Sequence, residues 1–211
     1  MKTTAIIALA ATFGIALTAG PLAAVPAPGK PRKEVERSVP ISAKIPASAD
    51  EAIAVLNDHI NNLRQMSARF EHVSPTGRRA RGTLSYVRPA SFRFVYDAPA
   101  TLEILSDGKS IAIRDSHRGV NEIYSVDQTP LRFLVKERID FAKDTRITGV
   151  DIAPNGVIRA RFEDTTTLTG TNRLEIEFDA IKGMLRKWTI DERNGGKTTI
   201  VLSDVNVVMS K

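Results

Sequence analysis

Hydrophobic and polar residues alternate along most of the chain from residue 67 to residue 209, as they do in strands that bury one face. The clearest example is the stretch Gly82–Tyr96, with the sequence GTLSYVRPASFRFVY. It holds two alternating runs separated by Arg88-Pro89, and proline is poorly tolerated inside a strand ladder. The pattern predicts a hairpin with an apolar, aromatic face, and the parity of Arg88 places this arginine on the same face.

Short alternating runs of this kind recur with turn residues between them, which gives about eleven strands. Asp107-Gly108 has the sequence of a hairpin turn, and the segment 154–156 (Pro-Asn-Gly) forms another. An antiparallel meander of this length must curl or be covered, because its apolar face needs a partner. We therefore predict a mainly β fold with a few helices.

One long amphipathic helix is predicted ahead of the strands, from Ser48 to about Gln65. Ser48 and Glu51 have the spacing of a capping box. Apolar residues recur at intervals of three and four and form one stripe: Ile53, Leu56, Ile60 and Leu63. The stripe indicates a helix that packs on the sheet.

The segment 129–144, TPLRFLVKERIDFAKD, interrupts the strands. Thr129 suits a helix N-cap and Pro130 suits the first helical position. Leu131, Leu134 and Val135 share a face at helical spacing, and Phe133 flanks them. We predict short, apolar helical segments between two halves of the sheet, which makes this segment a candidate lid.

The first 24 residues have the pattern of a cleaved secretory signal, with Lys2 followed by an apolar run and small residues. An uncleaved membrane anchor is the alternative, although the run is at the short end for a span of ~20 residues. Residues 25–47 are rich in proline and basic residues and predict a disordered linker, either a solvated tail or a membrane-surface contact. Residues 48–211 then form one folded domain.

The net charge of +6 favours anionic partners. Export from the cytoplasm removes nucleic acid from these candidates. The chain has no cysteine, which excludes disulfides, cysteine-based metal sites and a thiol nucleophile. No histidine spacing typical of a metal site is present, and no cofactor is expected.

An enzyme is a weak interpretation. Asp115-Ser116-His117 brings three residues of hydrolase chemistry together in sequence. Adjacent residues do not place a nucleophile against its base, however, and the chain lacks a G-x-S-x-G elbow. We therefore expect a non-enzymatic protein.

Two interpretations of the aromatic face remain open from the pattern alone. The residues on it either fill an ordinary core beneath the helices or line a cavity that accepts an apolar ligand when the helices move. The pattern by itself favours the filled core.

Several motifs in order resemble the LolA family, the periplasmic carriers of outer-membrane lipoproteins. They are Phe70-Glu71, the set Gly82, Leu84, Tyr86, Arg88, Pro89 and Phe92, the run Ser106–Ser110, and Thr129-Pro130-Leu131 before an apolar helix. The resemblance covers about residues 49–208.

The resemblance implies an incomplete antiparallel β-barrel closed by a helical lid over an apolar cavity. Its implied cavity residues are Leu84, Tyr86, Phe92, Phe94, Tyr96, Leu102, Ile104, Ile111 and Ile113. The implied lid residues are Leu131, Phe133, Leu134 and Val135. Arg88 is implied as the latch that holds the lid, and Phe92 as a residue at the cavity mouth that meets a transporter.

The resemblance also implies a function. A monomer in the periplasm takes acylated lipoproteins released by an inner-membrane ABC transporter and delivers them to the outer membrane. Family members carry an extra C-terminal element that aids handover, and this chain shows no clear equivalent after Met209, which leaves an outer-membrane receptor open as a partner. Two alternatives use the same half-barrel: a lipid- or glycolipid-binding protein, or a regulatory protein that senses lipoproteins.

Overall fold

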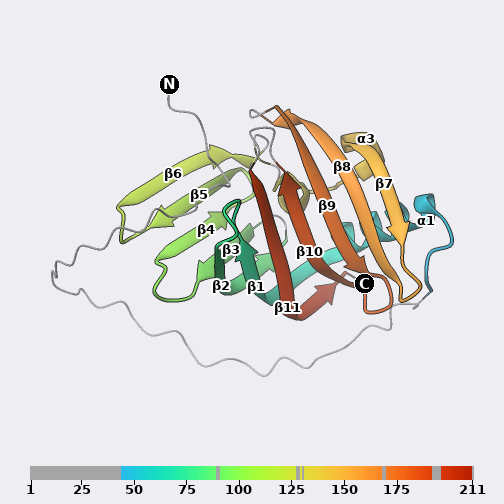
Figure 1. Cartoon of the computed structure of the whole chain (residues 1–211), viewed down its shortest axis with the longest axis horizontal. Coiled ribbons are helices and arrows are strands. Elements are labelled where there is room, and N and C mark those ends of the chain that lie inside the picture. The colour runs from blue at the N-terminus through green and yellow to red at the C-terminus, as the bar shows by residue number, and fades with distance from the viewer. Residues whose placement is uncertain are drawn as a thin grey trace.

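The computed structural model describes residues 44–88, 91–126, 129, 131–167, 170–191 and 196–210, and in these residues it forms one antiparallel sheet of eleven strands with three helices (Figure 1). The first half of the sheet holds β1 (Leu63–Val73), β2 (Arg79–Val87), β3 (Ser91–Tyr96), β4 (Leu102–Ser106), β5 (Ser110–Asp115) and β6 (Val120–Ser125). The second half holds β7 (Arg146–Ile152), β8 (Val157–Thr167), β9 (Gly170–Asp179), β10 (Met184–Asp191) and β11 (Lys197–Met209). The helices are α1 (Ala49–Asn62), α2 (Arg132–Val135) and α3 (Phe141–Asp144).

The strand order is β6-β5-β4-β3-β2-β1-β11-β10-β9-β8-β7. Each half is the meander that the alternation predicts. The halves are joined by pairing of the first and last strands, with Phe70 opposite Leu202. The sheet edges are therefore β6 and β7, which lie on opposite sides of the molecule (Figure 1). The predicted incomplete barrel is confirmed, and the chain between β6 and β7 has to cross from one edge to the other.

Helix α1 begins where the sequence predicts. The Ser48 hydroxyl accepts a hydrogen bond from the Glu51 amide at 3.2 Å. The reciprocal bond differs from the usual capping box, because the Glu51 carboxylate accepts from the amide of Ala47 at 2.8 Å. A backbone amide at the helix start is still satisfied, which is what the motif achieves.

The end of this helix is a correction to the prediction. Helix α1 ends at Asn62, and Leu63 already has an extended conformation that starts β1. Gln65 lies in the sheet opposite Val87 and Val208. Tertiary strand pairing on both sides of β1 therefore overrides the helical spacing of the last residues.

The core lies between the inner face of the sheet and the three helices. Trp188 of β10 is fully buried at its centre. Its ring meets Phe94 of β3 edge-on at 6.2 Å between centroids and Phe133 of α2 at 6.0 Å. Trp188 thus contacts β3, in the first half of the sheet, and α2, which covers the inner face of the sheet.

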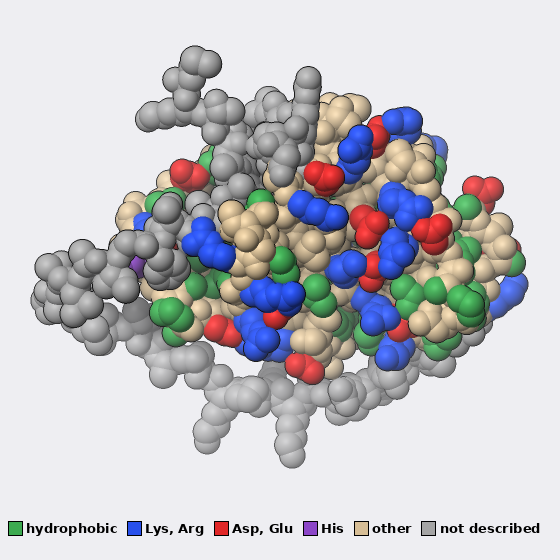
Figure 2. All heavy atoms as spheres, in the orientation of Figure 1, with side chains coloured by type: hydrophobic (Ala, Val, Ile, Leu, Met, Phe, Trp, Pro, Cys, Tyr) green, Lys and Arg blue, Asp and Glu red, His purple; other side chains and the backbone are tan. Residues whose placement is uncertain are grey.

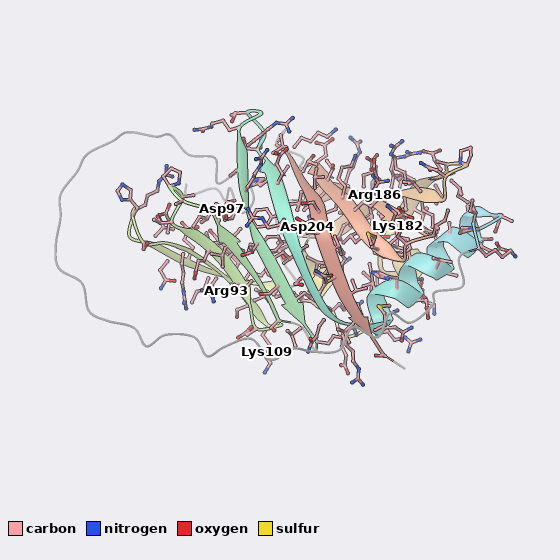
Figure 3. The ribbon with its side chains drawn as sticks, turned by 90° about the horizontal axis from the view of Figure 1, so that it is seen from below. Arg93, Asp97, Lys109, Lys182, Arg186 and Asp204 are labelled. Atoms are coloured by element: carbon pink, nitrogen blue, oxygen red, sulfur yellow. The ribbon has the colours of Figure 1, made fainter. Side chains whose placement is uncertain are left out.

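The outer face of the sheet carries cross-strand ion pairs. Glu71 pairs with Arg79 and Arg81, and Arg159 lies directly opposite Glu177 at 3.0 Å. Figure 2 shows Lys and Arg interspersed with Asp and Glu over this face. Figure 3 shows from below that charged side chains also project from both halves of the sheet. Much of the positive charge is therefore neutralised locally by carboxylates.

The last residues assigned to the linker lie against the domain. Pro46 is buried, and Ala47 donates to Glu51. The signal segment and residues 25–43 lie outside the described residues. Within the part of the chain that the structure describes, no helix is long and apolar enough to cross a membrane.

Gly82, the first residue of the hairpin motif, lies in β2 opposite Phe70 and Tyr96. A Cβ at this position would come within 2.2 Å of the Val95 carbonyl oxygen and 2.6 Å of Phe70 Cζ. The backbone cannot retreat inside a sheet paired on both sides, so glycine is required here.

We expect Gly82→Ala to lower the free energy of unfolding by about 1–3 kcal/mol, the usual cost of overpacking. Gly149→Ala in the edge strand β7 is the matched control, because a Cβ there meets only the guanidinium of Arg161, a movable group. We expect the control to change stability by less than about 0.5 kcal/mol in urea denaturation. Equal effects of the two substitutions would contradict this account.

Candidate functional site

A small cavity of about 50 Å³ lies between the inner faces of the two halves of the sheet and the start of the lid. Most of the predicted cavity residues line it: Phe94, Tyr96, Leu102, Ile104, Ile111 and Ile113, with Leu131 from the lid segment. Its other lining residues were not predicted: His72, Thr129, Trp188, Ile190, Thr198 and Ile200. They come mainly from β1, β10 and β11, and Trp188 of β10 reaches the cavity across the core, where its ring meets Phe94 of β3.

Leu84, Tyr86 and Phe92 are corrections to the predicted lining. Each is only 2% exposed and is packed in the core without facing the cavity. They share the inner face with Phe94. Tyr86 and Phe92 lie opposite each other, nearer the end of the strands where α1 meets β1, and Leu84 lies directly opposite Phe94. Phe92 contacts Phe94 edge-on at 5.5 Å and is buried in this closed state, and its place at the mouth of an opened cavity stays a prediction.

The size of the cavity decides whether the aromatic face, in the closed protein, belongs to a filled core or lines a ligand cavity. A volume of about 50 Å³ holds about one water molecule, whereas sites for drug-sized ligands have about 300–1,000 Å³. The inner face is therefore a filled core when the lid is closed. An acyl chain enters only if the lid segment moves outward.

The lid consists of α2, α3 and their connection. Phe133, Leu134 and Val135 are buried against the sheet, as predicted from their spacing, and Leu131 is half-buried. Phe141 of α3 stacks on Phe162 of β8 at 4.4 Å between centroids. The lid thus covers both halves of the sheet with apolar side chains.

The start of the lid differs from the predicted cap. Leu131 occupies the N-cap position of α2, and Thr129 is fully buried with its hydroxyl donating to the Val126 carbonyl at 3.0 Å. Pro130 lies outside the described residues, as does Pro89.

Arg88 ties three elements together. It follows β2 as a turn residue, and its amide donates to the Arg64 carbonyl of β1 at 2.8 Å. Its Nη1 donates to the Glu137 carbonyl of the lid at 2.5 Å, and its Nη2 donates to the Ile60 carbonyl in the last turn of α1 at 2.6 Å. A helix end leaves such carbonyls unpaired, so the guanidinium satisfies α1 while it holds the lid.

Burial raises the pKa of Tyr86, and the nearby Arg88 guanidinium partly offsets this by favouring the phenolate. The phenol is therefore neutral beside the latch at physiological pH. Arg88 Nε is buried without a hydrogen-bond partner among the described residues.

A second fastening of the lid was not predicted. The Asn61 side chain pairs with both backbone groups of Ile139, donating to its carbonyl at 2.8 Å and accepting from its amide at 2.9 Å. Asn57, one turn earlier, accepts from the Phe141 amide at 3.1 Å. Asparagine is a poor helix former. Its presence at positions 57 and 61, one turn apart in the predicted helix, was the signal in the sequence that these side chains have a polar partner.

The lid is also fastened to the second half of the sheet. Arg132 Nε lies 2.7 Å from Asp164 of β8, and its Nη2 donates to the Asp144 carbonyl at 2.8 Å. Lys136 pairs with the Asp144 carboxylate at 2.5 Å. Polar bonds therefore surround the lid, and apolar contacts lie beneath it.

The two kinds of contact differ in their cost of opening. A neutral hydrogen bond of the lid is worth about 0.5–1.5 kcal/mol net, because water replaces it on opening, and a bond from the charged Arg88 is worth about 1.5–3 kcal/mol. Exposing a buried Phe, Leu or Val side chain costs about 1.5–3 kcal/mol each. An apolar ligand that replaces the lid contacts removes the larger cost, so this arrangement suits binding of hydrocarbon.

Two buried histidines complete the electrostatics. Burial lowers the pKa of His72 in the cavity wall to about 4, and it lowers the pKa of His59, on the buried side of α1, to about 4. His59 packs on Phe178 of β9 with 4.6 Å between the ring centroids. Both rings are neutral at physiological pH.

The sequence cluster Asp115-Ser116-His117 forms a turn. Asp115 Oδ1 accepts from the Thr101 hydroxyl at 2.6 Å and from the His117 amide at 3.1 Å. The carboxylate therefore caps the β5–β6 turn, and its other oxygen lies 3.6 Å from the Arg118 guanidinium. Among the described residues, no group of three His, Asp or Glu side chains is arranged to hold a metal ion.

A comparison with protein-family models matches residues 61–210 to the outer membrane lipoprotein carrier protein LolA. The chain belongs to the LolA family. The match spans all eleven strands and the lid. Membership places the chain among carrier-type proteins related to lipoprotein sorting, as the motifs from Phe70 to Leu131 imply.

The solved structures to which this LolA-family chain is similar share little sequence with it. A putative outer membrane lipoprotein-sorting protein domain from Vibrio parahaemolyticus is 10% identical, with 76% of this chain and 93% of that one covered and a TM-score of 0.42. A LolA superfamily protein from Nitrosomonas europaea is 11% identical, with 77% and 94% covered and a TM-score of 0.38. The MucA/MucB complex of Pseudomonas aeruginosa gives 14% identity, 76% and 58% coverage and a TM-score of 0.41. No curated protein sequence matches the chain.

We expect Asn61→Ala to loosen the lid, because both backbone groups of Ile139 lose their partner. Exchange of the Ile139 amide hydrogen should speed up by about tenfold, which corresponds to one or two hydrogen bonds. Asn62→Ala is the matched control, since Asn62 Nδ2 bonds only to Asp58 within the same helix. Equal exchange of the Ile139 amide in both variants would show that Asn61 does not hold the lid.

The buried histidines predict a fall in stability on mild acidification. With folded pKa values of about 4 against 6.5 for the free side chain, the unfolded chain binds more protons between pH 6.5 and 4. Stability therefore decreases as the pH falls through this window, by at most about 3 kcal/mol per histidine. The carboxylates whose pKa values are lowered in the folded protein affect its stability only below about pH 4.

The measurement is urea denaturation at a series of pH values. His59→Gln and His72→Gln should each remove about half of the pH dependence between 6.5 and 4. An unchanged slope in both variants would refute the assignment.

Proposed function

We propose that this chain is a periplasmic carrier that shields the acyl chains of lipoproteins released from the inner membrane and delivers them to the outer membrane. The observation that carries the proposal is the apolar lid over the inner face of the sheet, fastened at its rim by Arg88 and Asn61. Membership of the LolA family supports the same proposal.

The proposed partners follow from this role. Acylated lipoproteins are the cargo, and an inner-membrane ABC transporter supplies them to the carrier, which acts as a monomer. The proposed location depends on export by residues 1–24, which lie outside the described residues. An outer-membrane receptor is a further proposed partner.

The free-energy cost of opening the lid and the gain from burying an acyl chain are of similar size. Displacing Phe133, Leu134 and Val135 costs about 5–9 kcal/mol at about 1.5–3 kcal/mol each. Hydrocarbon gains ~0.8 kcal/mol per buried methylene, so about ten methylenes offset the opening. A lipid with two or three long chains therefore opens the lid, and loss of the lipid lets the lid close.

A release assay tests the carrier function. Purified protein incubated with spheroplasts should release newly made lipoproteins into a soluble complex. A lid-locked variant gives a matched control: Asp58→Cys with Arg138→Cys places two thiols on either side of the groove between α1 and the lid, in a chain that has no other cysteine.

The double variant is treated with a bifunctional thiol reagent that a reductant cleaves. We expect the cross-linked protein to release no lipoprotein and the reduced protein to regain release, with single-cysteine variants unaffected. Absence of release by the folded, unlocked protein would overturn the carrier proposal.

Arg88→Leu tests the latch. The variant keeps the inner core but loses the bonds to Glu137 and Ile60, so the closed, empty state becomes less favourable. We expect intact folding by circular dichroism and delivery of bound cargo slowed by at least about tenfold, since bonds from a charged donor are worth about 1.5–3 kcal/mol each. Delivery at the wild-type rate would show that Arg88 is not a latch.

A further inference from the structure

The cavity wall holds a buried polar pair among its apolar residues. His72 of β1 and Tyr96 of β3 both line the cavity, and Tyr96 Oη lies 2.8 Å from His72 Nδ1. His72 is only 8% exposed, and its Nε2 has no hydrogen-bond partner among the described residues. Burying an unpaired ring nitrogen is unfavourable. A carrier that needs only an apolar surface would therefore gain nothing from His72 Nε2.

Hydrogen-bond accounting assigns the proton on the ring. If Nδ1 carried it, the ring would donate to Tyr96 Oη, and both the phenol hydrogen and Nε2 would lack partners. If Nε2 carries it, the phenol donates to Nδ1, and Nε2–H is the single group left unpaired. The second tautomer leaves fewer buried groups unsatisfied, so the ring presents a donor at Nε2.

The strand register places this donor at one end of the cavity. His72 lies opposite Ile200 of β11, beside the end of the sheet where β1 turns into β2. Thr198, two residues from Ile200, is on the same inner face. Arg88 lies at the other end of β2. The cavity therefore has His72 and Thr198 at the end remote from the latch, and among its other described lining residues only Thr129 has a polar side chain besides Tyr96 and Trp188.

We propose that His72 Nε2–H binds the carbonyl oxygen of the ester or amide that links an acyl chain to its head group. This inference rests on the proposed acyl-binding function and names the ligand class for the same cavity: neutral acyl esters and amides, in preference to plain hydrocarbon. His72 is on the sheet and not on the lid, so the donor stays in place when the lid moves.

The chemistry of the wall favours a carbonyl over other polar groups. A carbonyl oxygen accepts the bond and brings no hydrogen that needs a partner of its own, whereas a hydroxyl does. A carboxylate is disfavoured, because the described residues that line the cavity include no Lys or Arg to pair with it. Burial keeps His72 itself neutral.

Matched lipid probes test the proposal. Glycerol monopalmitate has the ester carbonyl, and 1-O-hexadecylglycerol has the same chain length with an ether in its place. Binding of each is followed below its aggregation threshold through the fluorescence of Trp188, the one tryptophan of the chain, which lines the cavity. We expect the wild-type protein to bind the ester about five- to tenfold more tightly than the ether.

Three variants locate the effect. His72→Phe keeps a ring but no donor and should bind the two probes equally. His72→Gln keeps an N–H donor at similar reach and should retain the preference. His59→Phe, the matched control, alters a buried histidine outside the cavity and should behave as wild type.

The outcomes separate this proposal from the carrier function. Equal binding of both probes by the wild-type protein, or a preference that survives in His72→Phe, overturns the carbonyl subsite and leaves acyl binding standing. No binding of either probe by the wild-type protein overturns acyl binding itself and this inference with it.

Discussion

An open sheet with one apolar face cannot remain uncovered in water, and the rest of this structure follows from that constraint. Pairing of β1 with β11 joins two meanders into one sheet and leaves β6 and β7 as edges. The only covalent link between these edges is the segment that carries α2 and α3, so the connection is also the cover. Trp188 lies where the sheet and this cover meet.

The cover is held by two kinds of interaction with different roles. Burial of Phe133, Leu134, Val135 and Phe141 supplies most of the free energy of closure. Bonds from Arg88 and Asn61 to backbone groups of the lid position it and add a smaller share of that free energy. The polar bonds therefore set the position in which the lid closes. A hydrocarbon ligand competes with the apolar side chains of the lid for the same surface of the sheet.

Much of the site could be predicted from local pattern, and the rest could not for an identifiable reason. Alternation in Gly82–Tyr96 correctly predicted the buried aromatic face, and helical spacing correctly predicted the buried lid residues. His72, Trp188 and Thr198 were missed as cavity residues because no local pattern shows that β1, β10 and β11 line the same cavity as β3. Leu84 and Phe92 have the right parity, but parity does not tell which residues of the inner face border a cavity, and Leu84 does not border it although it lies directly opposite Phe94.

By itself, the sequence determined the eleven strands, the start of α1, the lid segment and the family, because period, turns and capping are local properties. Only the tertiary structure decided that α1 stops at Asn62, that the first and last strands pair, and that the closed interior is filled to within about 50 Å³. The physical reason is that strand pairing and side-chain packing join residues over a hundred positions apart. No local pattern records which of those residues meet.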